Sequence, residues 1–230
     1  MDVNRRQVAD IGCGGGIYAK ALFEMGAEHI TCIDPSEVML SDARSKLKAY
    51  HNVAFVQGDA LHTGTQDQQF HIVLEHALIH HLQAEELRDC FAEALRILKP
   101  GSTLIVQDRT PEDCLLPGSN THIRGYFFDR YPRLAQIEVA RRHTNATVQN
   151  ALREAGFRII EKRQLWETRQ IYIDFAALES DLKARTGRSI LHELSDNELQ
   201  DLITYIHSQL ESDTQPIVEQ DHWTIWSALR

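Results

Sequence analysis

The stretch Val8-Ala-Asp-Ile-Gly-Cys-Gly-Gly-Gly16, followed by Ile17-Tyr18, decides the fold class of this chain. It joins a short apolar run, a glycine-dense turn and the start of a helical pattern. Glycine has no Cβ, so the backbone of such a turn can lie close against a ligand. About 20 residues after the turn, Asp34 ends a second apolar run, where a carboxylate can bind the hydroxyls of a ribose. The two motifs predict a site for a nucleoside cofactor.

Strand and helix patterns alternate over the first 107 residues. The expected strands are 7–11, 29–33, 53–57, 70–74 and 102–106, and the expected helices are 17–25, 36–50 and 84–98. This alternation predicts an α/β fold, a parallel sheet with helices on both faces. Such folds bind ligands at the carboxyl ends of their strands. Acidic residues stand at five of these ends and predict a polar rim there: Asp10, Asp34, Asp59, Glu75 and Asp108.

The second half of the sequence is less regular. Residues 108–143 contain three prolines and several aromatic residues, and we expect a long connection there. A helix over 147–155, a sixth strand from 157, helices over 171–183 and 197–210, and a last strand over 222–229 follow. The two helices between the last strands predict a cap. The apolar stripe of the 197–210 helix favours core packing or a homodimer contact over a membrane face.

Composition excludes several classes of protein. The formal net charge of -9 argues against a nucleic-acid partner, which requires a basic face. The 4 cysteines lie far apart, so we expect neither disulfides nor structural zinc, and a reducing cytoplasm fits. No run of apolar residues is long enough for a signal peptide or a membrane span, so no membrane partner is expected.

The glycine spacing narrows the choice of cofactor. The loop has Gly12, Gly14 and Gly16, whereas a dinucleotide fingerprint requires a glycine where Ile17 stands. A pyrophosphate would also be repelled by the carboxylate of Asp10, which favours a cationic ligand instead. S-adenosylmethionine carries an ammonium and a sulfonium and no phosphate.

Five motifs in order carry a resemblance to a known family. They are VADIGCGGG (8–16), CIDPSEVML (32–40), FVQGDALH (55–62), FHIVLEHALIHHL (70–82) and ALRILKPGSTLIVQD (94–108). In these the chain resembles class I S-adenosylmethionine-dependent methyltransferases, in particular the "methyltransferase type 11" group. The resemblance implies a Rossmann-like seven-stranded sheet of order 3-2-1-4-5-7-6 with an antiparallel last strand. We expect a cofactor domain over 1–164 and 216–230 and a helical cap over 165–215. Family members usually carry a helical segment before the first strand, which this sequence does not show.

The family's site residues carry over by position. The loop from Asp10 to Gly16 would hold the methionine end of S-adenosylmethionine, and Asp34 the ribose. Pro35 and Met39 would lie near the adenine, whose amino group Asp59 would bind, with Ala60 beside the ring. Glu75 and His76 would lie near the reactive methyl group. Turn glycines and ordinary strand-end carboxylates are the structural alternatives for these residues.

Other residues are candidates for the chemistry and the acceptor. His80 and His81 follow the fourth strand and suit proton transfer near neutral pH, although such histidines are often structural. His76 and His80 have helical spacing without the glutamate of a metalloprotease motif, so no metal is expected. Tyr126, Arg130 and Arg141 are candidates for binding the substrate; packing and local salt bridges are the alternatives.

Taken together, the sequence predicts a cytoplasmic S-adenosylmethionine-dependent methyltransferase acting on a small molecule. Two alternatives stay open. One is another nucleoside-cofactor enzyme on the same fold, and the other is a methyltransferase-like binding or scaffold protein without turnover.

Overall fold

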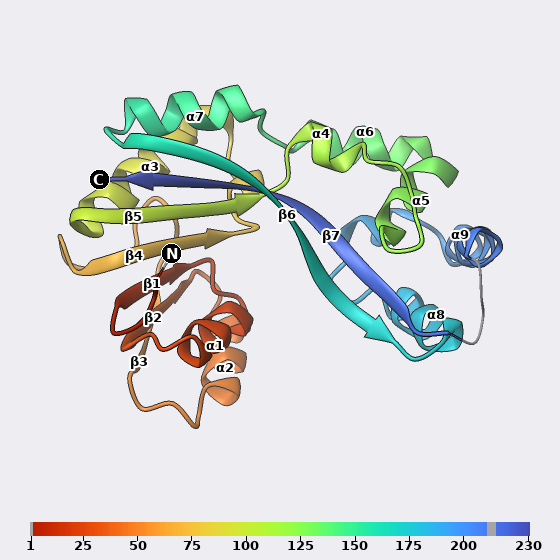
Figure 1. Ribbon diagram of the computed structural model, residues 1–230, viewed down its shortest axis with the longest axis horizontal. Helices are drawn as coiled ribbons and strands as arrows, with labels where there is room; N and C mark the ends of the chain where they lie inside the picture. Colours follow the sequence, from red (N-terminus) through yellow and green to blue (C-terminus); the bar gives the residue numbers. More distant parts are fainter. Residues whose placement is uncertain (1, 211–214) are drawn as a thin grey trace. The chain divides into compact units, whose positions relative to one another are not determined.

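The structure is a computed structural model that describes residues 2–210 and 215–230. It contains one seven-stranded sheet of order β3-β2-β1-β4-β5-β7-β6 (Figure 1). The strands are β1 (Gln7–Ile11), β2 (His29–Asp34), β3 (Val53–Gln57), β4 (Phe70–His76), β5 (Leu98–Asp108), β6 (Arg158–Tyr172) and β7 (Ile217–Leu229). The first five pair in parallel, and β7 is antiparallel to both β5 and β6. The predicted fold class and strand order are confirmed.

The chain divides into two compact units. The first unit comprises Met1–Asp108, His143–Arg163 and Ile225–Arg230, and the second comprises Arg109–Arg142 and Gln164–Thr224. The second unit thus includes the 109–142 segment as well as most of the region expected to form a cap. Residues 211–214 of that expected cap lie outside the described part of the chain.

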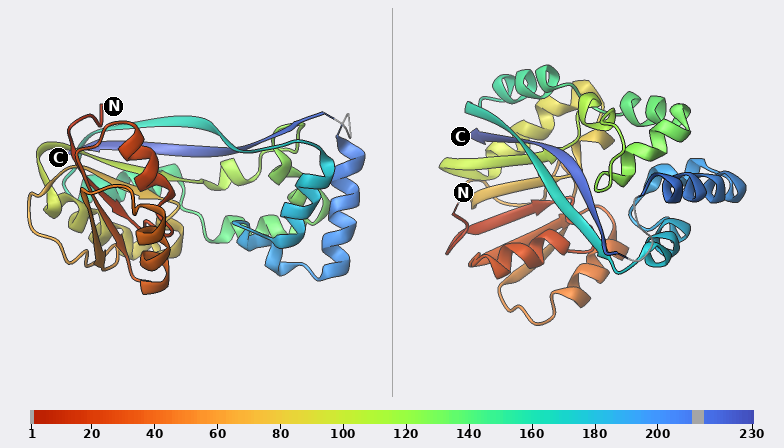
Figure 2. Two further views of the ribbon diagram at one scale, coloured as in Figure 1. Left: turned by 90° about the horizontal axis from the view of Figure 1, so that it is seen from below. Right: turned by 45° about the vertical axis from the view of Figure 1, so that its right-hand side comes forward.

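Helices cover both faces of the strands in the first unit. They are α1 (Ile17–Glu24), α2 (Glu37–Lys46), α3 (Leu87–Ile97) and α7 (Asn145–Glu154). Figures 1 and 2 show α3 and α7 side by side, across the strands from α1 and α2. Successive residues of a strand point to opposite faces of the sheet. Val8 packs in one apolar cluster with residues of α1 and α2, and Ala9 packs in another with residues of α3 and α7. The expected continuous apolar strands are therefore buried on both sides.

The second unit has its own apolar core. Its helices are α4 (Pro111–Cys114), α5 (Ile123–Arg130), α6 (Pro132–Ala140), α8 (Phe175–Ala184), the short 3-10 helix η3 (Ser189–Glu193) and α9 (Asp196–Gln209). Their buried faces meet in one cluster that includes Phe127, Leu178 and Leu202. Over the described residues, we find no helix with both the length and the apolar character needed to span a membrane.

Two expectations about this half of the chain were wrong. The 108–143 segment is helical rather than an irregular connection, because Pro111 and Pro132 each stand in the first turn of a helix, where proline is tolerated. The helix expected from Ile171 begins only at Phe175, and β6 runs on to Tyr172. Asp174 caps that helix by accepting a hydrogen bond from the N–H of Ala177.

Candidate cofactor and active site

The glycine turn between β1 and α1 has a backbone that only glycine suits. Gly12 and Gly16 have φ angles of 71° and 75°, in the left-handed region. A Cβ on Gly16 would come within 3.1 Å of the Ala43 side chain, and one on Gly12 within 2.6 Å of Leu78. The N–H groups of Gly12 and Cys13 both donate to the carbonyl of Ile33, at 2.8 and 3.1 Å. The turn is thereby drawn against the carboxyl end of β2.

Asp34 ends β2 and is held in place by two backbone donors. Its Oδ2 accepts from the N–H of Gly14 and its Oδ1 from the N–H of Ser36, each at 2.9 Å. The side chain is buried, with 8% of the residue exposed. Each carboxylate oxygen can accept a further hydrogen bond. Asp34 is therefore both a brace for the glycine turn and an acceptor with capacity left for a ligand hydroxyl.

A pocket of about 390 Å³ opens at these strand ends. Its lining is mostly apolar, with carboxylates at two positions, and its volume falls in the range of small-molecule sites. It is lined by Gly12, Asp34, Pro35, Asp59, Ala60, Ala77, Leu78, His81 and Leu82, all from the first unit. Five predicted cofactor residues and one predicted histidine are thus brought together. Met39, which is 41% exposed, does not line this pocket.

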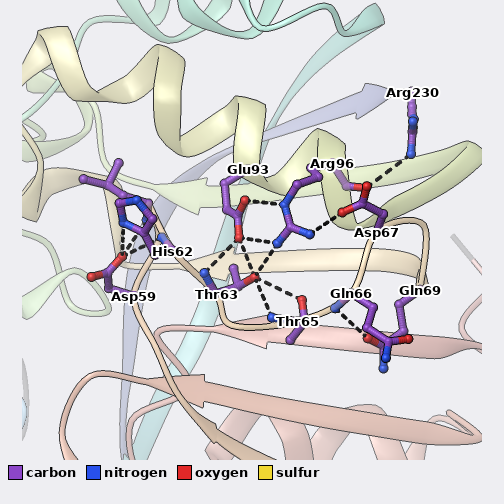
Figure 3. A network of polar contacts seen from close by, with 11 residues as sticks. Asp59, His62, Thr63, Thr65, Gln66, Asp67, Gln69, Glu93, Arg96 and Arg230 are labelled. Carbon is purple, nitrogen blue, oxygen red and sulfur yellow. Dashed lines mark hydrogen bonds and ion pairs between the residues drawn. The ribbon is translucent and has the colours of Figure 1, made fainter.

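Asp59 stands in a loop that a polar network supports. Its Oδ1 accepts from the N–H groups of Leu61 and His62, at 2.8 and 2.7 Å. Further along the loop, the N–H and hydroxyl of Thr63 donate to Glu93 of α3, which Arg96 also binds (Figure 3). Arg96 and the donors on Thr63 hold the pKa of Glu93 down, to about 2, against the effect of burial. The network fixes the loop that places Asp59.

Two buried carboxyl groups, Asp10 and Glu75, lie on neighbouring strands and have unused oxygens. Each is the last residue but one of its strand, β1 or β4, and the exposed fractions are 1% for Asp10 and 0% for Glu75. Burial raises the pKa of Asp10 to about 7 and that of Glu75 to about 8. Among the described residues, neither Asp10 Oδ2 nor Glu75 Oε2 has a hydrogen-bond partner. A cationic ligand group beside either carboxyl group would supply a counter-charge.

His80 is bound to a buried carboxylate. It lies in the 3-10 turn η1 (Ile79–His81), and its Nδ1 is 3.0 Å from Oδ2 of Asp108 at the end of β5. The N–H of His80 donates to the same oxygen at 3.2 Å. If Nδ1 carries the proton, Nε2 is a free base. His143 supports the turn, with Nε2 3.0 Å from the carbonyl of Ile79 and 3.1 Å from that of Leu82.

The other predicted residues have diverse surroundings. The ring of His76 lies 3.8 Å from that of Tyr18, centroid to centroid, and the ring of His81 lies 4.1 Å from that of His80. The predicted substrate residues all belong to the second unit. Tyr126 is buried beside Tyr205, Arg130 forms a two-pronged ion pair with Asp201, and Arg141 pairs with Glu138.

Sequence reasoning missed several of these arrangements. It placed Asp108 on the rim without linking it to His80, because the residues are 28 positions apart and only the pairing of β4 with β5 brings them together. The Glu93–Arg96 pair had a detectable signal, since a three-residue spacing puts both side chains on one helix face.

Comparisons with known proteins agree with this geometry. Residues 8–101 match the model of a family described as "Methyltransferase domain". A demethylmenaquinone methyltransferase of Clavibacter sepedonicus is 26% identical over 170 residues, which is 69% of this chain and 68% of that protein. A ribosomal protein L11 methyltransferase of Halalkalibacterium halodurans is 31% identical over 104 residues, 43% of this chain and 30% of that one.

Solved structures share the fold. A putative methyltransferase from an antibiotic biosynthesis pathway of Anabaena variabilis superposes with a TM-score of 0.71 at 20% identity, covering 98% of this chain and 91% of its own. The alignments with three curated relatives span 42%, 68% and 48% of the relatives' own lengths, so this chain matches about half of such proteins. Residues 8–101 thus match a methyltransferase-domain model, and the chain shares its fold with solved S-adenosylmethionine-dependent methyltransferases.

Proposed function

We propose that the whole protein transfers the methyl group of S-adenosylmethionine to a small-molecule acceptor. The observation that carries the proposal is the pocket at the strand ends. Gly12, Asp34, Pro35, Asp59 and Ala60, which the family resemblance assigns to the cofactor, line one cavity. In this assignment Asp34 binds the ribose hydroxyls and Asp59 the adenine amino group, with Pro35 and Ala60 against the ring.

The unused oxygens of Asp10 and Glu75 support a cationic cofactor rather than a dinucleotide. S-adenosylmethionine supplies an electrophilic methyl group on a positively charged sulfur. The glycine turn would hold its methionine end, and Glu75 and His76 would lie near the methyl. Two carboxyl groups with raised pKa values lose their protons more readily when a positive group lies beside them.

Within this function, His80 is the candidate general base. An acceptor hydroxyl, amine or acidic carbon must lose a proton as it is methylated, whereas a carboxylate need not. Asp108 would hold the His80 ring in the tautomer that leaves Nε2 free to take that proton. Positioning of the acceptor and exclusion of water supply the rest of the rate enhancement.

The location and partners are part of the proposal. The net charge of -9 supports a small molecule over a nucleic acid as acceptor. The four cysteines, Cys13, Cys32, Cys90 and Cys114, are free and buried, which supports the reducing cytoplasm. A homodimer stays a prediction that sedimentation analysis can test.

Calorimetry tests the cofactor and turnover tests the activity. We expect heat of binding with S-adenosylmethionine and none with a nicotinamide dinucleotide. Asp34→Ala is expected to weaken binding at least about tenfold, because a charge-assisted hydrogen bond is lost. Asp89→Ala is the matched control, since Asp89 is an exposed aspartate on α3. Equal affinities for the two variants would contradict the assignment.

The acceptor class is tested by formation of S-adenosylhomocysteine. Oxygen, nitrogen, sulfur and carbon acceptors form the small-molecule arm, and a transfer RNA and a ribosomal protein extract form the macromolecular arms. Turnover in a macromolecular arm alone would overturn the small-molecule proposal. Cofactor binding without turnover in any arm would favour a scaffold protein.

A further inference from the structure

The second unit contains an arginine cluster around one buried glutamate. Glu138 of α6 is 0% exposed. It forms ion pairs with Arg124 of α5, at 2.8 Å, and with Arg141 and Arg142, which follow α6. Burial alone would raise the pKa of Glu138, but Arg124 and Arg142 outweigh burial and hold it well below its usual range. Glu138 is thus a carboxylate shared among several cations.

Positive charge exceeds negative charge in this cluster even on a conservative count. Arg124 and Arg141 alone bring two guanidinium charges to Glu138, before Arg142 is considered. A buried cation without a full counter-charge is costly, since the interior solvates charge poorly. The cost is offset if an anion joins the cluster.

Arg109 experiences the positive charge of the same arginines. It is 9% exposed, pairs with Asp221 at 2.9 Å and lies 3.8 Å from the ring centroid of Trp223. Burial lowers the pKa of Arg109, and the charge of Arg124 lowers it further, despite Asp221. A negatively charged group among these arginines would raise the pKa of Arg109 again.

Hydrogen-bond donors are also unused. The Nε atoms of Arg124 and Arg141 are buried and have no hydrogen-bond partner within 2–210 and 215–230. Arg124 is 8% exposed, whereas the side chain of Arg141 is 31% exposed and gives the cluster an accessible edge. A guanidinium presents its N–H groups in a planar fork that matches a carboxylate or a phosphate.

We propose that Arg124 and Arg141, with Arg109 and Arg142 contributing charge, form a binding site within the second unit for an anionic small molecule that carries a carboxylate or a phosphate. In this site Glu138 shares its charge among the arginines and leaves N–H donors for the ligand.

Anion titration of the whole protein tests the site without turnover. Thermal stability is followed against sodium phosphate and against sodium succinate, each compared with sodium chloride at equal ionic strength. We expect a saturable stabilisation with one or both oxyanions and none with chloride. The stronger of the two identifies the group that the site accepts.

Three variants locate the binding. Arg124→Gln and Arg141→Gln are each expected to weaken oxyanion binding at least about tenfold, because a charge-assisted donor is removed. Arg133→Gln is the matched control, because Arg133 lies on the same helix α6 as Glu138 in an exposed ion pair with Glu198. Arg141 is partly exposed, so that variant tests the site even if Arg124→Gln does not fold.

Glu138→Gln provides a test of opposite sign. Removing the shared carboxylate raises the net positive charge, so oxyanion affinity is expected to rise several-fold. No saturable effect of either oxyanion on the wild type would overturn the proposal, as would an equal loss in Arg133→Gln. Calorimetry with S-adenosylmethionine on the same variants keeps the two proposals separate: intact cofactor binding with no anion binding would sink this inference and leave the methyltransferase assignment standing.

Discussion

Asp10→Asn is expected to stabilise the protein at alkaline pH while weakening its binding of the cofactor. Asp10 is 1% exposed, and burial raises its pKa to about 7, from 3.8 for the free side chain. The folded state therefore retains a proton on Asp10 that the unfolded chain has already lost. Between about pH 4 and pH 7 the folded form binds more protons, so stability due to this group falls as the pH rises.

The size of the effect follows from the difference between the folded and unfolded pKa of Asp10. A tenfold difference in acidity corresponds to about 1.4 kcal/mol, and ionised Asp10 opposes folding in full above pH 7 and only in part at pH 5. The penalty therefore grows by about 3 kcal/mol between pH 5 and pH 8. Asparagine has nearly the shape of protonated aspartate and does not titrate. In Asp10→Asn the penalty therefore no longer increases with pH. Any constant cost of an unpaired amide N–H cancels in the comparison of the two pH values.

Urea unfolding of both proteins at pH 5 and pH 8 measures this difference. We expect the stability of Asp10→Asn relative to wild type to improve by on the order of 3 kcal/mol from pH 5 to pH 8. Calorimetry at pH 8 should show weaker binding of S-adenosylmethionine, since its positive charge loses a carboxylate. A stability difference that does not change with pH would refute the raised pKa, and unchanged cofactor affinity would refute the role of Asp10.

Three further outcomes are expected from other parts of the first unit. Glu93→Gln should lower the free energy of unfolding by about 2 kcal/mol at pH 7, measured with urea. The pKa of Glu93 is about 2 in the folded protein and 4.5 in the free side chain, so the stability difference between variant and wild type should shrink as the pH falls from 4.5 toward 2. Gly16→Ala should lower stability by about 1 to 2 kcal/mol, since φ is 75° and the new Cβ meets Ala43; a melting temperature equal to that of wild type would contradict it. His80→Gln should reduce turnover about a hundredfold with cofactor affinity unchanged; full activity would exclude His80 as the base.

The part of the fold with local signals could be predicted from the sequence. β1, the glycine turn and Asp34 are specified by residues close together in the chain. The family resemblance implied the strand order and five of the residues that line the pocket. The helical 109–142 segment escaped prediction because proline interrupts a helix in its interior but starts one at its first turn. Whether a proline interrupts or starts a helix depends on where the helix begins, and the residues next to these prolines do not determine the first residue of the helix.

The candidate site was predictable to the extent that it is built from strand ends. The carboxylates of β1, β2 and β4 lie toward the same edge of the sheet because parallel strands end there, although the register puts Asp10 and Glu75 on opposite faces. The His80–Asp108 contact and the Arg124–Glu138 pair depend on side-chain directions across elements far apart in sequence. Arg141 was singled out for its charge, yet its ion pair with Glu138 appears only when α6 is formed.

Asp10 and Glu75 in the first unit and the arginine cluster in the second share one physical principle. Each buries charge or potential charge without a full counter-charge, and each leaves polar atoms without a hydrogen-bond partner. Such groups lower the stability of the ligand-free protein, and a ligand of opposite charge restores part of it. A cation such as S-adenosylmethionine suits the carboxyl groups, and an oxyanion suits the arginines. Because the carboxyl groups ionise near pH 7 to 8 while the arginines do not titrate there, stabilisation by the cofactor should grow as the pH rises through that range, and stabilisation by the oxyanion should not.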